Sequence, residues 1–231
     1  SLTTAQVAAL TSDQLNGVAS GDFDASSTNQ IKALTTDQMS ALSTAQVQLL
    51  QTTQVAALSS LQVAKLSSDA IASLTTDQVK QLSTAALNAL SSDQLAAMES
   101  GSIAALTTAQ LSKLSTAQLV KLSTAQIESF TTDQTQALTT AQIASLTSDQ
   151  VNNMASDDLK ALTTAQVKAL TTAQISTLTA AQIALMETTD IAALTAAQAE
   201  KLTTQAVAAL TTDQIKALSS AALNALTSDQ I

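Results

Sequence analysis

The sequence is an uninterrupted array of one eight-residue unit, of which Leu-Thr-Thr-Ala-Gln-Val-Ala-Ala, beginning at Leu2, is a clear example. With Leu2 as position one, that position recurs at every eighth residue as far as Leu226, which gives 29 octads over residues 1–231 without an insertion or deletion. We therefore interpret the chain as a single continuous array, cut from a longer one, in which every octad occupies an equivalent place.

Two positions of the octad are apolar along the whole array. Position one is apolar in every octad except that of Ser26, and position six in every octad except that of Thr135. Position three is Ser or Thr in all octads but two, and position five is Gln in 21 of the 29. One continuous helix cannot align these positions, because eight residues at about 100° each leave a drift of about 80° per octad. A β-solenoid usually needs Gly, Asn or Pro at its corners, and the chain has three Gly and no Pro.

The polar positions of the octad indicate a helix start in every repeat. Ser or Thr at position two, followed three residues later by Gln, is the pattern of a capping box, as in Thr75 to Gln78 and Thr163 to Gln166. Leu before the cap and Val or Ile at the fourth helical residue form a hydrophobic staple. We therefore expect each octad to contain one helix of about six residues, with position two as its N-cap.

The distribution of charge supports the same interpretation. Of the 18 acidic residues, 15 lie at positions two to five, and all nine Lys lie at positions seven or eight. Acids near the start of a helix and bases near its end are stabilised by the helix dipole. A strand or a disordered octad gives no reason for this separation.

The predicted fold is therefore all-α: a solenoid or superhelix of very short helices around a narrow core of Leu, Ile and Val. A six-residue helix is not stable alone in water, so each must bury positions one and six against its neighbours. The chain has no Trp or Tyr and only two Phe, which fits a thin aliphatic core better than a thick one. The number of octads in each superhelical turn stays open.

Four octads, which begin at Val18, Met98, Met154 and Met186, lack both the hydroxyl at position two and the Gln at position five. One interpretation is a bend or a weak cation site, because Ser, Asp and Gly occur there together. The other is a changed cap, in which the Ser or Thr at position three becomes the N-cap and an acid lies at the second helical residue. We favour the changed cap.

The residue types exclude most kinds of catalytic site. Without His or Cys, the usual bases, nucleophiles and transition-metal ligands are missing, and the acids are dispersed along the array. We therefore expect no enzyme activity and single out no catalytic, cofactor-binding or metal-binding residue. The net charge of −9 disfavours nucleic acid as a partner, and no apolar stretch is long enough for membrane insertion.

The Thr-, Ala- and Gln-rich octads resemble repeat regions of large bacterial secreted or surface proteins of the adhesin or filament type. The resemblance covers the full chain and implies an extracellular or cell-surface rod, stalk or filament segment. We expect such a segment to associate with itself end to end. Two alternatives stay open: a surface that binds glycan or ice through the repeated Thr and Ser hydroxyls, as in Thr163 and Thr164, and an intracellular scaffold.

Overall fold

The computed structural model describes residues 2–231 and contains 28 short α-helices, with no strand in that range. The chain divides into two compact units, one ending at Leu122 and one running from Ser123 to Ile231. The helices of the first unit are α1 Thr4–Ala9, α2 Ser12–Asn16, α3 Ser20–Asp24, α4 Thr28–Lys32, α5 Thr36–Ala41, α6 Thr44–Leu49, α7 Thr52–Ala57, α8 Ser60–Ala64, α9 Ser68–Ala72, α10 Thr76–Gln81, α11 Thr84–Ala89, α12 Ser92–Ala96, α13 Ser100–Ala104, α14 Thr108–Leu111 and α15 Thr116–Leu119. Those of the second are α16 Thr124–Glu128, α17 Thr132–Ala137, α18 Thr140–Ser145, α19 Ser148–Asn152, α20 Ser156–Lys160, α21 Thr164–Ala169, α22 Thr172–Thr177, α23 Ala180–Leu185, α24 Thr188–Ala193, α25 Ala196–Glu200, α26 Thr204–Ala208, α27 Thr212–Ala217 and α28 Ser220–Asn224.

The prediction of one short helix per octad is confirmed for 28 of the 29 octads, and the last, incomplete octad (226–231) forms a turn instead. Every helix begins at position three and has the residue at position two as its N-cap, as Thr3 is for α1 and Thr163 for α21. The apolar residues at positions one and six therefore flank the first turn on either side, as the hydrophobic staple requires.

The chain changes direction between helices through extended residues. At the joint between α1 and α2, Leu10 has φ −64° and ψ 139°, and Thr11 has φ −71° and ψ 161°. No residue in the described range has a positive φ. The corner therefore needs no glycine, which explains how so sharp a fold forms from a chain with so few glycines.

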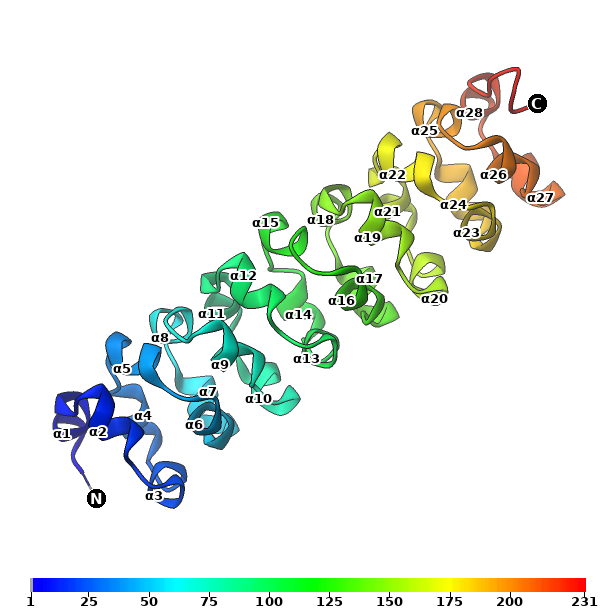
Figure 1. Cartoon of the computed structure of the whole chain (residues 1–231). Coiled ribbons are helices and arrows are strands. Elements are labelled where there is room, and N and C mark those ends of the chain that lie inside the picture. Colours follow the sequence, from blue (N-terminus) through cyan, green and yellow to red (C-terminus); the bar gives the residue numbers. More distant parts are fainter. Residues whose placement is uncertain (1) are drawn as a thin grey trace. The chain divides into compact units, whose positions relative to one another are not determined.

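In both units the helices are wound as a solenoid with three octads to a turn. Within each unit the helices pack three places apart, as in the series α1, α4, α7, α10 of the first unit and α18, α21, α24, α27 of the second. The turn length that the sequence left open is therefore about 24 residues. Figure 1 labels these helices within each unit.

Positions one and six supply the side chains between the turns. In the first unit Met39 and Val47 are fully buried, and in the second Ile143 and Ile175 are fully buried. Position one is slightly more accessible, and Leu74, for example, is 4% exposed. Position five is also buried along most of the array, although it carries polar Gln.

The charged side chains lie at the helix ends that the dipole argument assigned to them. Asp77 lies in the first turn of α10 and Lys80 in its last turn, with Nζ 3.8 Å from the carboxylate. Lys160 and Asp157 of α20 are paired in the same way at 3.9 Å. Because these pairs are largely exposed to water, each contributes little to stability.

Candidate functional site

The hydroxyls at position two cap the N-terminus of nearly every helix. In 23 of the 28 helices of the described range, a Ser or Thr side chain at the N-cap accepts a hydrogen bond from the third helical residue. At α21 the Gln166 N–H donates to Thr163 Oγ1 at 3.3 Å. The capping boxes predicted at Thr75 and Thr163 are confirmed.

The Gln at position five uses both ends of its amide. Gln166 Oε1 accepts from the Thr163 N–H at 2.8 Å, which completes the capping box of its own helix. Its Nε2 donates to the carbonyl oxygens of Thr135 and Leu138, each at 2.8 Å, in the preceding turn. Gln78 does the same in the first unit, with Nε2 2.8 Å from Val47 O and 2.6 Å from Leu50 O.

These inter-turn bonds follow a fixed register. Nε2 reaches the residues 31 and 28 places earlier, which are position six of one octad and position one of the next. The acceptors therefore lie at the joint between two helices, where carbonyl groups have no partner within the helix. The full pattern or part of it occurs at Gln30, Gln38, Gln46, Gln54, Gln62, Gln78, Gln94, Gln110, Gln118, Gln166, Gln174, Gln198, Gln214 and Gln230.

Sequence reasoning assigned the Gln to the cap and missed its bond to the preceding turn. A buried amide must have partners for its oxygen and its nitrogen, and this site supplies both from the backbone. The sequence did hold a signal. Glu serves a capping box as well as Gln does, yet position five never contains Glu. Of the two residues that complete a capping box, position five uses the amide alone, which indicates a need for its N–H donors.

The hydroxyls at position three lie at the first helical residue and remain at the surface. Thr164 and Thr172 are exposed, each next to the capping residue of its helix. The two hydroxyls of each octad therefore differ in role, because the one at position two is bonded into the cap. Only the hydroxyl at position three is left to face a ligand.

The changed cap predicted for the four irregular octads is wrong. The N-caps of α3, α13, α20 and α24 are Ala19, Glu99, Ala155 and Glu187, still at position two and without a side-chain cap bond. Because positions one and six must stay buried between the turns, packing holds each helix start in phase even where the capping hydroxyl is missing.

Position five of these octads carries Asp22, Ser102, Asp158 or Asp190, at the third helical residue rather than the second. Asp158 is 3% exposed and Asp190 is 2% exposed. Burial, and then the charge of Asp157, raises the pKa of Asp158 from 3.8 to about 6. Burial also raises the pKa of Asp190, against a hydrogen bond from the Glu187 backbone that lowers it.

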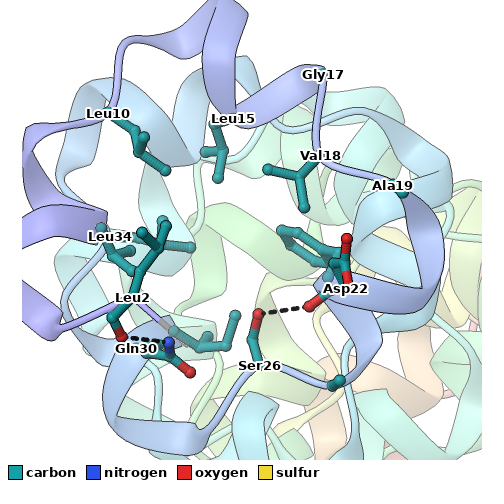
Figure 2. A pocket seen from close by; sticks show the side chains of 14 residues that line it. Leu2, Leu10, Leu15, Gly17, Val18, Ala19, Asp22, Ser26, Gln30 and Leu34 are labelled. Carbon is teal, nitrogen blue, oxygen red and sulfur yellow. Dashed lines mark hydrogen bonds between the residues drawn. The ribbon is translucent and has the colours of Figure 1, made fainter.

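A cavity of about 690 Å³ lies in the first turn of the first unit (Figure 2). Leu15, Phe23, Ile31 and Leu34, all at positions one or six, line it, so it is the apolar core of that turn. Ser26 widens it, because a small side chain stands where other octads have Leu. In the second unit, a cavity of about 410 Å³ is lined by Leu210, Ile215, Leu218 and Leu223, which are also at positions one and six and so belong to the apolar core.

Two polar side chains of the first cavity, those of Gln30 and Ser26, are bonded to backbone carbonyls. Gln30 Nε2 donates to Leu2 O at 2.7 Å, and Ser26 Oγ donates to Asp22 O at 3.2 Å, as the dashed lines in Figure 2 show. Within residues 2–231 no group of three or more acidic, His or Cys side chains is placed to hold a metal ion. No helix in the same range is long and apolar enough to cross a membrane.

Comparison with known families gives one match, repeated along the chain. The ALTTAQ repeat matches residues 18–52, 48–84, 79–108, 103–140, 151–186 and 183–220. The chain belongs to the ALTTAQ repeat family. The six letters correspond to position eight followed by positions one to five, which are the staple, the cap, the exposed hydroxyl and the Gln described above. A search of curated proteins finds no significant match for this ALTTAQ chain.

Proposed function

We propose that this ALTTAQ array is a non-enzymatic structural segment of an extracellular or cell-surface protein, serving as a stalk or as a filament-forming spacer. The observation that carries the proposal is the use of the repeated polar side chains by the fold itself. Thr163 and Gln166 illustrate it, since their side chains are bonded to backbone groups of their own helix and of the preceding turn. A side chain committed to the backbone is not available to a substrate.

The array is also built to be lengthened. Apart from the octad next to it along the chain, an octad bonds to octads three and four places earlier, as at Gln78 and Gln166, so one more turn adds the same contacts again without changing those already made. A protein that sets a distance between two attached parts needs this property. The same repetition supports self-association, because a turn from a second copy offers the donors and acceptors that a turn of the same chain offers.

Self-association is tested by sedimentation velocity and negative-stain electron microscopy of the purified 231-residue chain over a wide range of concentration. We expect end-to-end species whose length grows with concentration, and substitution of Ile215 by Asp, which places a charge on an exposed apolar residue of the second cavity, to suppress them. Substitution of the exposed Leu61 by Asp is the matched control. Monomers at every concentration would exclude the filament form of the proposal.

The location and the type of role are tested separately. An antibody raised against the chain should label intact cells of the source organism or its culture medium, and labelling only after permeabilisation would contradict the extracellular assignment.

Glycan-array and ice-recrystallisation assays should give no response. A response that is lost when the exposed Thr164 and Thr172 are both replaced by Val would instead favour a binding surface made of the hydroxyls at position three.

A further inference from the structure

Two buried carboxyl groups occupy the position that the rest of the array gives to Gln. Asp158 of α20 and Asp190 of α24 stand at position five, and both are almost completely enclosed. The register of the neighbouring Gln166 places the carbonyls of Ile127 and Phe130 opposite Asp158. The same register places the carbonyls of Leu159 and Leu162 opposite Asp190.

An ionised carboxylate cannot do what the Gln amide does at this position. It accepts hydrogen bonds and donates none, whereas the opposing carbonyls also only accept. Asp158 Oδ2 is buried and has no hydrogen-bond partner. A protonated carboxyl group, unlike a carboxylate, has one O–H donor, and the opposing backbone carbonyls can accept a hydrogen bond from it.

We propose that Asp158 and Asp190 are proton-operated replacements for the Gln: each holds its turn to the preceding one when protonated and loosens that contact when ionised. The array would then contain two pH-sensitive turns within a stack of insensitive ones. They are adjacent, because α20 packs on α17 and α24 packs on α21, the helix that follows α20. This inference goes beyond the proposed structural role and stands on different residues.

The surrounding charges oppose ionisation more than they assist it at Asp158. The charged groups on α20 and on the helices that pack on it are Asp157 and Lys160 of α20 and Asp133 of α17, and α23 carries none. Glu128 lies at the end of α16, which the register places opposite Asp158. Lys160 is paired with Asp157. The net charge of the groups around Asp158 is therefore negative, and negative charge nearby favours the protonated form of its carboxyl group.

Asp190 has a more mixed environment. Glu187 lies at the N-cap of its own helix, where its backbone N–H stabilises the carboxylate of Asp190 and its charge destabilises it. The helices that pack on α24 contribute Lys168 of α21 and Asp213 and Lys216 of α27, and Lys160 lies at the end of α20, which the register places opposite. Burial nevertheless raises the pKa of Asp190 above its usual range.

The direction of the pH effect follows from the raised pKa. A carboxyl group whose pKa is higher in the folded chain than in the unfolded chain stabilises the fold while it is protonated. For Asp158 this stabilisation is fully present below about pH 3.8 and is lost as the pH rises through about 6. The second unit should therefore be more stable in mild acid than at neutral pH.

The test replaces both carboxyl groups by the amide that the repeat normally carries. Thermal and urea unfolding of the full chain are followed by far-UV circular dichroism at about pH 4.5 and about pH 7.5. We expect Asp158→Gln to lower the unfolding equilibrium constant by up to roughly 100-fold at the higher pH and by less than roughly 10-fold at the lower pH, since a pKa shift of two units corresponds to two powers of ten. Asp158→Gln with Asp190→Gln should remove most of the pH dependence.

The control removes the same two charges elsewhere in the unit. Asp149→Asn with Asp213→Asn changes exposed acids at position four, and its stability should keep the pH dependence of the original chain. An equal loss of pH dependence in both double variants would overturn the proposal, because net charge alone would then explain it. Carboxyl carbon-13 NMR of the unmodified chain gives an independent readout. We expect the resonances of Asp158 and Asp190 to titrate above the usual range of an Asp, and titration of every Asp below about pH 4.5 would also overturn the proposal.

Discussion

At the scale of the residue, one side chain explains most of how the array holds together. The Gln at position five connects the start of its own helix to the segment between two helices of the preceding turn. Gln174 Nε2, for example, lies 2.9 Å from Ile143 O and 2.6 Å from Leu146 O. A buried polar network stabilises a fold only when every member has a partner. The amide meets this condition because its oxygen and its nitrogen face opposite kinds of backbone group.

Replacing Gln166 by Glu separates the two functions of this side chain. The carboxylate can still accept from the Thr163 N–H, but it faces the carbonyls of Thr135 and Leu138 without a donor. We expect a loss of about 3 kcal/mol in the free energy of unfolding at neutral pH, from urea titration, and partial recovery in acid as the Glu takes up a proton. The exposed Gln14 makes the same capping bonds, and Gln14→Glu should cost less than about 0.5 kcal/mol. Equal losses would show that capping alone matters.

Thr135 is the one polar residue at position six, and its hydroxyl is buried without a hydrogen-bond partner. Thr135→Val keeps the shape of the side chain and removes the unpaired group. We expect the free energy of unfolding to rise by about 1–2 kcal/mol in the same titration. Thr177, whose Oγ1 donates to Gln174 O at 2.9 Å, serves as the control, and Thr177→Val should give no gain. A fall in stability for Thr135→Val would contradict the unpaired assignment.

At the scale of the element, the helices are too short to persist by propensity. Four to six residues fall well below the length at which an isolated helix forms in water, so capping and packing must together fix each one. The irregular octads show which of the two sets the phase. Ala155 and Glu187 start helices at position two without a capping bond, so burial of positions one and six decides where a helix begins and the hydroxyl adds to its stability.

The two hydroxyls of one octad should therefore differ sharply in their effect on stability. Thr163→Ala removes the acceptor for the Gln166 N–H and should lower the free energy of unfolding by about 1 kcal/mol. Thr164→Ala changes the exposed residue beside it and should stay within about 0.5 kcal/mol of the original. Thermal unfolding followed by circular dichroism measures both. A larger cost at Thr164 than at Thr163 would contradict the assignment of the cap to position two.

At the scale of the whole molecule, the sequence was enough to predict the helices but not their contacts. Helix starts follow from local chemistry within one octad, as at Thr75 and Gln78, and local chemistry can be read from the sequence. The bonds between turns join residues 28 and 31 places apart, and a period of eight alone does not say how many octads complete a turn. The buried Asp158 escaped notice for the same reason, because its burial depends on the neighbouring turn.

The fixed register predicts how the array should respond to changes in its length. Deleting Ala137 alone would shift every later octad by one residue against the turn before it, so the Gln bonds and core contacts across that point would lose their partners together. We expect a cost of more than about 4 kcal/mol, or loss of the cooperative transition, by thermal unfolding. Replacing residues 138–145 by the octad of residues 162–169 keeps the register and should cost less than about 1 kcal/mol. If both changes were tolerated equally, the octads would not be stacked in a common phase.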